Sequence, residues 1–384
     1  MIIGIDASRA NHEQKTGVEW YAFFLIQELK KIISSNIQVV LYSEVPLQGE
    51  LAELPPNWSS KVLSWPPKRF WTQIRMSYEM LVNPPDVLFV PAHVFPFFHP
   101  KKTVMTVHDV AAIRFPQSYN WFERLYSTWS AKYAVQKLWR VIVPSEFTKT
   151  ELISSFTVLP LVGGGKEGVS PLNEKIRVVH HGFDTEFKQK KSDTEIVRVL
   201  KKYNIQKPFI LSIGRLEEKK NTVRIIQAFQ MWKEFYHHDE FQLLLIGKFG
   251  YGGEKVQKAI EESPVQKDIL HPGYVEQEDI PALFQAAEIF LFPSLYEGFG
   301  IPVLEAFASV VPVITSKNNS TEEIAGDAAI LVHPEDTDDM VGALEDLQKE
   351  KKLRDSLIEN GKKRMENFSW EKCARETVDI LIKN

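Results

Sequence analysis

The chain has very little cysteine: Cys373 is the only one among 384 residues. A single thiol cannot form a disulfide within the chain, and this scarcity is typical of reducing compartments. No run reaches the roughly 18 apolar residues of a membrane span. The nearest, DVLFVPAHVFPFF at 86–98, contains prolines and suits a buried strand followed by a loop. The start, MIIGIDASRA, lacks the basic flank and long apolar core of a signal peptide. We therefore expect a soluble, cytoplasmic protein.

Charge of one sign is also lacking, since the formal net charge is −4 at pH 7. This balance gives no general attraction for nucleic acid, so none is expected as a partner. Hydrophobic residues make up 44% of the chain and charged residues 25%, as in globular enzymes. The length predicts two or three domains.

Short apolar runs alternate with helical patterns through both halves of the chain. The first half has six predicted strands, at 1–6, 37–43, 86–91, 102–109, 140–145 and 175–182. The second half has six more, at 208–215, 241–248, 269–274, 289–294, 311–316 and 328–334. Near-continuous apolar strands separated by helices indicate parallel sheets covered on both faces. The pattern predicts an α/β protein with two doubly wound, Rossmann-like domains in tandem.

A polar, lysine-rich stretch at 184–208 is the predicted join between the two domains, 1–186 and 187–368. The last helix, 369–384, places Trp370, Cys373, Ala374, Thr377 and Leu381 on one face, and we expect it to return to the first domain. The run VGGGKEGVSPLNEK at 162–175 lacks the spacing of a phosphate loop and the Ser/Thr after its lysine. We interpret this glycine-rich segment as a mobile surface loop.

The run LFPSLYEGFGIPVLEAFAS at 291–309 places a glycine-rich turn between a strand and a helix, with Glu297 and Glu305 on either side. In open α/β sheets, ligands bind beyond the carboxyl ends of the strands, where helix N-termini present free N–H groups. The N–H groups of Phe299, Gly300 and Ile301 are candidates to hold an anion. The two carboxylates are suited to accept hydrogen bonds from sugar hydroxyls. The alternative is that Glu305, in the first helical turn, serves only to complement the helix dipole.

Two cations follow the strand at 208–215, on the same edge of the sheet. Arg215 and Lys220 stand in the loop GRLEEKKN, where they are suited to neutralise a diphosphate. The alternative is a solvated loop with internal ion pairs, which is our interpretation of Lys219. The segment EDTDDM at 335–340 mimics a metal-binding D-x-D, but it opens a helix, so we interpret it as a cap and predict no metal requirement.

In the first half, TVMTVHDV puts His108 at the end of a strand, although a lone histidine is more often structural. Gly17 precedes the first helix, where the backbone is able to pass close to a sugar or phosphate.

Seven ordered segments then resemble one family. EGFGIPVLEA is similar to the E-x7-E signature of the retaining glycosyltransferases of group 1 (family 4), which have the two-domain GT-B fold. The segments SIGRLEEKKN, TVHDV, VPSEFTKTEL, VVHHGFD, HPGYVEQEDIPALFQAAEIFLFPS and FSWEKCARET resemble its other landmarks in order. The resemblance implies two Rossmann-like domains facing a central cleft, an acceptor-side domain followed by a donor-binding one.

The resemblance also implies residue roles in binding a nucleoside-diphosphate sugar. It assigns the diphosphate to Arg215 and Lys220, the ribose to Glu305, and the transferred sugar to Glu297 and His108. It assigns the phosphate and sugar backbone contacts to Phe299, Gly300 and Ile301, and the nucleobase contacts to Tyr274 and Val275. The chain departs from the family in two places. It has only Gly17 where many members have a loop with paired glycines. The glycine-rich segment 161–174 matches no landmark of the family.

We therefore expect metal-independent, retaining transfer of a hexosyl group to an acceptor hydroxyl on a glycan, a lipid-linked glycan or a small molecule. A front-face route is favoured over a covalent intermediate, because no carboxylate stands out as the nucleophile. GDP-mannose is the preferred donor, since GIDASRA and KTGVEWYA resemble mannosyltransferase-like members. Alternatives are a catalytically silent nucleotide-sugar-binding partner or a related epimerase or phosphorylase. A dehydrogenase is disfavoured because no G-x-G-x-x-G follows the first strand.

The aromatic and basic segment PPKRFWTQIRMSYEML at 66–81 allows two interpretations. It either contacts the inner face of a membrane that bears a lipid-linked acceptor, or forms an ordinary helix with Trp71, Ile74 and Tyr78 turned inward.

Overall fold

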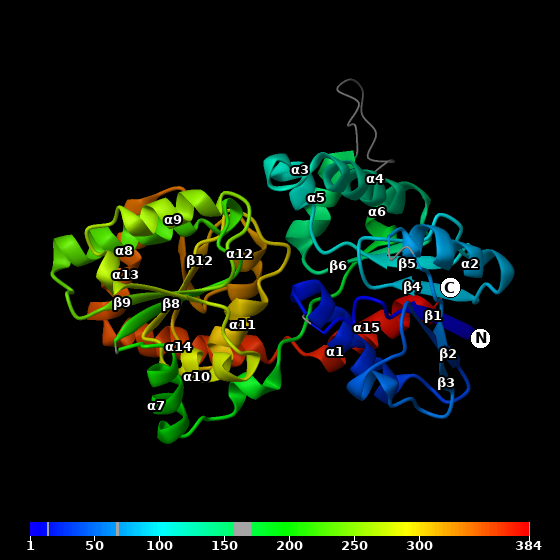
Figure 1. Ribbon diagram of the computed structural model, residues 1–384, viewed down its shortest axis with the longest axis horizontal. Helices are drawn as coiled ribbons and strands as arrows, with labels where there is room; N and C mark the ends of the chain where they lie inside the picture. The colour runs from blue at the N-terminus through cyan, green and yellow to red at the C-terminus, as the bar shows by residue number, and fades with distance from the viewer. Residues whose placement is uncertain (14, 67–68, 157–169, 207, 384) are drawn as a thin grey trace. The chain divides into compact units, whose positions relative to one another are not determined.

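The computed structural model describes residues 1–13, 15–66, 69–156, 170–206 and 208–383. The chain forms two compact units (Figure 1). The first comprises Met1–Gly182 and Ser369–Asn384, and the second comprises Phe183–Phe368. Among the described residues, no helix is both long enough and apolar enough to cross a membrane.

The first unit is built on a parallel sheet with strand order β3-β2-β1-β4-β5-β6-β7. Its strands are β1 (Ile2–Asp6), β2 (Gln38–Ser43), β3 (Trp58–Val62), β4 (Val87–Val90), β5 (Thr103–Thr106), β6 (Arg140–Val143) and β7 (Ile176–Val178). The direction of winding reverses between β1 and β4, which pair in parallel. The carboxyl ends of these two strands therefore mark the ligand-binding edge of this sheet.

Helices cover both faces of the first sheet. They are α1 (Gly17–Ile32), η1 (Gly49–Ala52), the π-helix η2 (Trp71–Met76), α2 (Ser77–Val82), α3 (Ala111–Arg114), η3 (Pro116–Ser118), α4 (Trp121–Lys137), α5 (Glu146–Phe156), α6 (Ser170–Lys175) and α15 (Trp370–Ile382). α15 packs on α1 and buries Trp370, Cys373, Ala374, Thr377, Ile380 and Leu381. Gly182 permits this packing, because a Cβ there would lie 2.2 Å from the backbone nitrogen of Trp370.

The second unit has a parallel sheet with the order β10-β9-β8-β11-β12-β13. Its strands are β8 (Phe209–Ile213), β9 (Gln242–Ile246), β10 (Ile269–Gly273), β11 (Ile289–Phe292), β12 (Val313–Ser316) and β13 (Ala329–Val332). Its helices are η5 (Thr185–Lys188), α7 (Asp193–Lys202), η6 (Glu218–Lys220), α8 (Thr222–Tyr236), α9 (Gly253–Glu261), η7 (Gln266–Asp268), η8 (Gln277–Asp279), α10 (Ile280–Ala286), α11 (Ile301–Ala308), α12 (Ser320–Ala325), α13 (Thr337–Lys349) and α14 (Lys351–Met365). The winding reverses between β8 and β11.

Successive residues of these strands point to opposite faces and fill two separate cores. Leu211 on β8 and Leu244 on β9 lie in one core, whereas Ile210 and Leu243 lie in the other. Burial on both faces explains why these strands appear in the sequence as unbroken apolar runs.

The prediction of two doubly wound α/β units is confirmed, with all twelve expected strands present. The sequence prediction missed β3, whose residues after Trp58 are exposed. The inward-facing interpretation of 66–81 is wrong for two residues: Trp71 is buried, but Ile74 and Tyr78 are exposed. Residues 157–169, which include much of the glycine-rich segment, lie outside the described residues; the rest of the segment forms α6, so its interpretation as a loop is wrong there.

Candidate functional site

The strand order of the second unit brings two loops together at its switch point. Because β8 and β11 are neighbours in the sheet, the loops that follow them, 214–221 and 293–300, meet at one edge. The backbone N–H of Leu295 donates to the carbonyl of Lys219 over 2.8 Å. The buried Asn221 side chain also donates to the carbonyl of Pro293 over 3.0 Å. These bonds fix one loop against the other.

The start of α12 holds Glu297 in place. The backbone N–H of Glu297 donates to Asn319 Oδ1 over 3.0 Å, and its carbonyl accepts from Ser320 Oγ over 2.8 Å. Asn319 Nδ2 donates in turn to the carbonyl of Ser294 over 3.0 Å. This support was not predicted from the sequence, although an asparagine before STEE is a typical N-cap signal.

Gly300 ends this loop and begins α11 in a conformation that favours glycine. Its φ is +110°, and a Cβ there would lie 2.9 Å from Cγ2 of Thr321. Neither the Gly300 nor the Ile301 N–H has a hydrogen-bond partner among the residues the structure describes. The Phe299 side chain is buried, so only its backbone faces the turn. The start of α11 therefore offers donors to an anion.

The two predicted cations lie in the loop after β8. Lys220 forms an ion pair with Glu297 and lies over the ring of Phe292, 5.2 Å from its centroid. Arg215 is exposed and makes no ion pair or side-chain hydrogen bond with the described residues. Its stem lies across Gly250, where a Cβ would be 2.5 Å from Arg215 Cδ. Lys219 pairs with Glu217 at 3.4 Å, which confirms its interpretation as an internal ion pair.

Glu305 lies one turn further into α11. The helix begins at Ile301, so Glu305 is its fifth residue, and its expected place in the first turn is wrong. The side chain is half-buried, and burial, with a smaller contribution from Asp184, raises the pKa of this carboxyl to about 8. Glu305 is therefore mainly protonated at neutral pH in the free protein.

Tyr274 and Val275 follow β10, two strands away from β8. Val275 is buried in the core, whereas Tyr274 is exposed, with Lys248 Nζ 5.5 Å from its ring centroid. At the ends of β8 and β9, Gly247 packs so closely on Gly214 that a Cβ would lie 1.9 Å from the Gly214 carbonyl oxygen. A residue with a Cβ at 247 would therefore force these two strand ends apart.

In the first unit, His108 lies just beyond β5 and is buried. Its Nε2 lies 2.9 Å from the carbonyl of Pro91, which can only accept, so the neutral ring carries its hydrogen on Nε2. Burial is the main cause that lowers the pKa of His108 to about 4, and the neighbouring His93 adds to it. The imidazole is therefore neutral at physiological pH, and its Nδ1 is an acceptor.

Gly17 is the first residue of α1, after the cap formed by Thr16 and Glu19. It is exposed, and a Cβ there would meet nothing within 4 Å. The packing of the first unit therefore does not itself require glycine here.

A hollow of about 210 Å³ lies beside this region of the first unit. Val18, His93, Asp109 and Tyr119 are among its lining residues. The sequence analysis did not single out His93, although PAH directly follows β4 at the switch point of this sheet.

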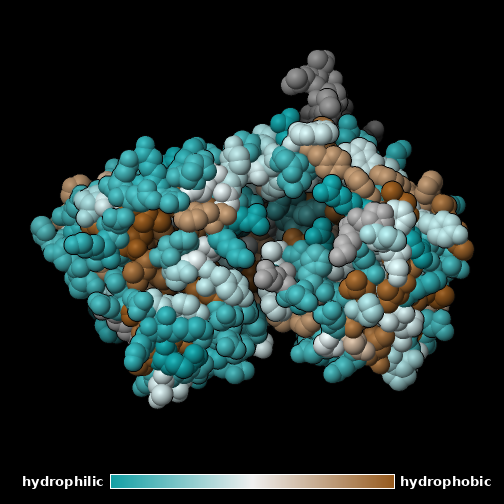
Figure 2. Space-filling view, viewed as in Figure 1, coloured by the Kyte–Doolittle hydropathy of each residue, from teal (hydrophilic) through white to brown (hydrophobic). Residues whose placement is uncertain are grey.

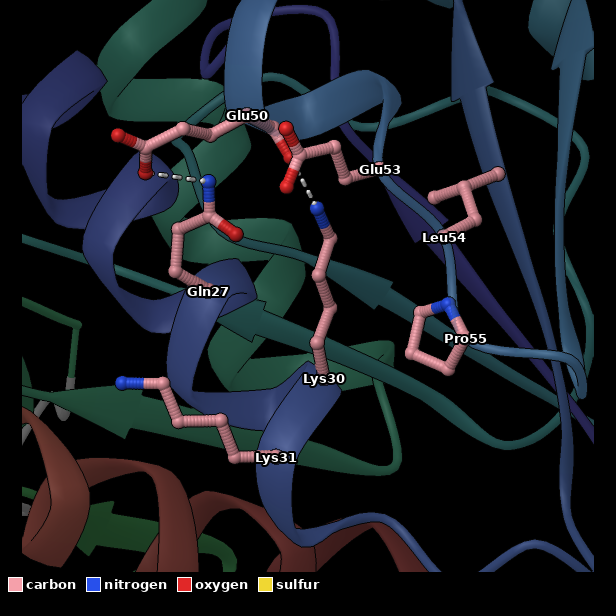
Figure 3. Close-up of a pocket in the computed structure, with 7 residues that line it drawn as sticks. All are labelled: Gln27, Lys30, Lys31, Glu50, Glu53, Leu54 and Pro55. Atoms are coloured by element: carbon pink, nitrogen blue, oxygen red, sulfur yellow. Dashed lines mark hydrogen bonds between the residues drawn. The ribbon is translucent and has the colours of Figure 1, made fainter.

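A second hollow, on the outside of the first unit, has a structural explanation (Figure 3). Lys30 donates to the carbonyl of Glu50 over 2.6 Å, and Gln27 donates to its carboxylate over 3.2 Å. These bonds fasten η1 to α1.

The interpretation of 335–340 as a helix cap is confirmed, because the Asp336 side chain accepts a hydrogen bond from the N–H of Asp339 over 3.2 Å.

Within the second unit, the structure thus gathers Arg215, Lys220, Glu297 and the backbone of 299–301 at one switch point, with Glu305 a turn beyond. Charges of both signs, with the N–H groups of Gly300 and Ile301 that have no partner among the described residues, suit a ligand that carries both phosphate and hydroxyl groups.

Comparisons with known proteins identify the family of the chain. Residues 193–364 match the family model of glycosyl transferases group 1, and residues 15–187 match that of glycosyltransferase family 4. The O-antigen chain mannosyltransferase B of Escherichia coli is 27% identical over 280 residues, covering 73% of this chain and 70% of that protein.

Solved structures share the fold. WaaG, a glycosyltransferase involved in lipopolysaccharide biosynthesis, has a TM-score of 0.72 at 15% identity, covering all of both chains. HepE from Anabaena, in complex with UDP-glucose, also has a TM-score of 0.72 at 15% identity, covering 99% of this chain and 98% of that one. The two family models together span nearly the whole length of the chain, and its two units have the GT-B fold. This chain belongs to the group 1 glycosyltransferases.

Proposed function

We propose that this glycosyltransferase moves a hexosyl group from a nucleoside-diphosphate sugar to an acceptor hydroxyl, with retention of configuration and without a metal. The observation that carries the proposal is the convergence of Arg215, Lys220, Glu297 and the start of α11 at the β8–β11 switch point. A diphosphate leaving group gains negative charge as its bond to the sugar breaks. Preorganised cations and N–H groups stabilise that charge where it develops.

The Lys220–Glu297 ion pair supports a specific exchange of partners on donor binding. In the free protein the two groups neutralise each other at a partly buried position. A bound diphosphate takes Lys220 as its counter-ion and releases the Glu297 carboxylate to accept hydrogen bonds from hydroxyls of the transferred sugar. Arg215, which is exposed and has no ion-pair partner among the described residues, adds a second cation. Its planar guanidinium is able to contact two phosphate oxygens at once.

Glu305 is assigned to the ribose. With a pKa of about 8, its carboxyl holds a proton at neutral pH and is able to donate one hydrogen bond and accept another. Vicinal hydroxyls present the same combination of donor and acceptor. A half-buried position also shields these bonds from water.

His108 is assigned to a hydroxyl of the transferred sugar. Because its Nε2–H is engaged by Pro91, the free Nδ1 lone pair is available to accept a hydrogen bond. A pKa of about 4 makes the ring a weak base, so it positions the sugar rather than deprotonating the acceptor.

Retention is proposed to follow a front-face route. The bond from the anomeric carbon to the phosphate oxygen breaks, the acceptor oxygen bonds the same face of that carbon, and its proton passes to the departing phosphate. The ion pairing of Glu297 with Lys220 supports a binding role for this carboxylate over a nucleophilic one. Detection of a glycosyl adduct on the protein by intact-mass spectrometry would contradict this route.

Mannose carried by GDP is the proposed donor. It is supported by the likeness to the O-antigen chain mannosyltransferase of Escherichia coli, whose name also suggests a growing glycan as acceptor. HepE, by comparison, has been solved with UDP-glucose. The acceptor is proposed to be a glycan, free or lipid-linked.

The first experiment is a thermal-shift panel of GDP, UDP and ADP with their hexose conjugates, with and without EDTA. A ligand that binds only the folded state raises the melting temperature with its concentration. We expect one nucleotide family to do so, unchanged by EDTA, and the shift to vanish in Arg215→Ala and Lys220→Ala. Lys219→Ala is the matched control and should keep the shift, since Lys219 pairs with Glu217 instead. No shift with any nucleotide, or equal loss in the control, would reject the site.

A turnover assay then separates an enzyme from a silent binding protein. The protein is incubated with the donor that gave the shift, and nucleoside diphosphate release is followed with and without candidate glycans. Proton NMR of the first product reports the anomeric configuration. Binding without release would favour the silent partner, and inversion would refute the retaining mechanism.

A further inference from the structure

The first unit exposes a concentration of large apolar side chains, here called the aromatic patch. Of the large hydrophobic residues exposed among the described ones, nearly half lie in three short segments of this unit. The members are Phe70, Ile74, Tyr78, Leu81, Val82, Phe97, Phe98, Trp121, Phe122, Leu125 and Trp129. Scattered apolar residues on a surface need no explanation, but a contiguous patch marks an interaction site.

Two helical stripes make up most of the patch. On α4, Trp121, Leu125 and Trp129 recur every four residues and are all exposed, Trp121 by 74%. Four-residue spacing places side chains on one face of a helix. The apolar face of α4 is therefore turned outward over these turns, whereas the buried residues Ser130 and Ala131 face the core.

The second stripe runs through η2 and α2. Phe70, Ile74 and Tyr78 are exposed at the same spacing, Tyr78 by 61%. Trp71 and Met76 of the same segment are buried, so the segment has enough apolar residues to pack inward and still leaves others exposed.

The three segments adjoin one another. The rings of Phe70 and Phe122 lie 6.1 Å apart, and those of Phe97 and Trp129 lie 5.8 Å apart. The backbone N–H of Phe98 lies 3.4 Å from Ser77 Oγ on α2. Figure 2 shows hydrophobic residues gathered on the side of this unit where Figure 1 labels α2 and α4. The segments form one surface, not isolated exposed residues.

Basic residues accompany the aromatic patch, although the whole chain is acidic. The segments 69–82, 97–102 and 121–132 contain Arg69, Arg75, Lys101, Lys102, Arg124 and Lys132, against Glu79 and Glu123. Glu79 is buried and already paired with Lys61 and Arg75, so neither Glu79 nor Arg75 adds net charge to the surface. The charge that the surface offers to a partner is therefore positive.

We propose that the aromatic patch docks the protein onto the surface of a lipid bilayer with anionic headgroups. Trp and Tyr side chains, with an apolar body and a polar tip, suit the boundary between headgroups and acyl chains. Flanking Lys and Arg are attracted to anionic lipid at a distance set by ionic strength. A surface of this kind lies in the headgroup region of the bilayer and does not span the bilayer. This proposal goes beyond the proposed function, because it does not require glycosyl transfer.

The test is flotation of the full-length protein with vesicles of phosphatidylcholine alone and of phosphatidylcholine with phosphatidylglycerol. We expect flotation with the anionic vesicles, weaker flotation with the neutral ones, and a decrease as salt is raised. The double variant Trp121→Ser/Leu125→Ser should reduce the vesicle-bound fraction at least about tenfold at limiting lipid. Both residues are exposed, so its circular dichroism and melting temperature should match the wild type.

Phe235→Ser in the second unit is the matched control, because Phe235 is 65% exposed and lies outside the patch. It should float like the wild type. No flotation with either vesicle, or a double variant that floats as well as the wild type, would overturn the proposal. A wild-type dimer that the double variant converts to monomer, without flotation, would also overturn it and assign the patch to self-association.

Discussion

Replacing Gly300 by alanine tests whether the start of α11 depends on a backbone that glycine adopts most easily. With φ at +110°, a side chain at this position should cost about 1–3 kcal/mol in backbone strain. The new Cβ would also lie 2.9 Å from Cγ2 of the buried Thr321, a contact that overpacks the core by about 1–3 kcal/mol. We therefore expect Gly300→Ala to lower the free energy of unfolding by about 2–6 kcal/mol.

A second substitution separates the two causes. Thr321→Ser removes Cγ2 and keeps the hydroxyl, which donates to the carbonyl of Ser316 over 3.3 Å. Alone it should cost about 1 kcal/mol for the lost buried methyl group. In the double variant, alanine at 300 no longer meets Cγ2. The double variant should therefore lose about 1–2 kcal/mol less stability than the sum of the two single variants. The strain from φ should remain.

The assay is urea unfolding followed by circular dichroism, with the transition of the first unit as an internal reference. Gly342→Ala is the matched control, since Gly342 lies within α13 and a Cβ there meets nothing within 4 Å. That variant should be more stable by about 0.5–1 kcal/mol, because alanine favours helix. The reasoning fails if Gly300→Ala is as stable as the wild type, or if Thr321→Ser gives no coupling with it.

Three further predictions concern the site residues. Burial raises the pKa of Glu305 from 4.5 to about 8, so the stability contributed by its neutral carboxyl is complete below about pH 4.5 and is lost as the pH rises through 8. The melting temperature should therefore fall over this range, and Glu305→Gln should flatten the fall. A pH profile unchanged by Glu305→Gln would contradict the protonated carboxyl. A double-mutant cycle of Lys220→Met and Glu297→Gln should give a coupling of about 1–2 kcal/mol in thermal unfolding, and independent effects would exclude the ion pair. Gly17→Ala should leave stability within about 0.5 kcal/mol, because its Cβ meets nothing, but should weaken substrate binding; unchanged kinetics would remove Gly17 from the site.

The strands were predictable because of how parallel sheets are buried. Strands covered on both faces, such as β8 and β11, consist almost entirely of apolar residues and are bounded by polar ones. β3 escaped prediction because it lies at the edge of its sheet and its residues Ser59, Ser60 and Lys61 are exposed. Its backbone pairing with β2, rather than an apolar run, makes it a strand.

The site was predictable only as far as the strand-end rule reaches. That rule placed Arg215, Lys220 and Glu297 at the edge of a sheet from their positions after predicted strands. It gave no sign that Lys220 and Glu297 pair with each other, since they are far apart in the sequence and meet only because β8 and β11 are neighbours. The support from Asn319 depends on β12 lying beside β11.

By itself, the sequence determined which residues share a face, where each chain segment turns, and which family's motifs are present, because these are local properties of spacing and residue type. Only the tertiary structure decided what covers each face and which charges meet. The same four-residue spacing describes a helix packed inward and one turned to solvent, and for Ile74, Tyr78 and the stripe on α4 the fold left the apolar residues exposed. The protonation of Glu305 likewise depends on burial by segments distant in sequence, Asp184 among them.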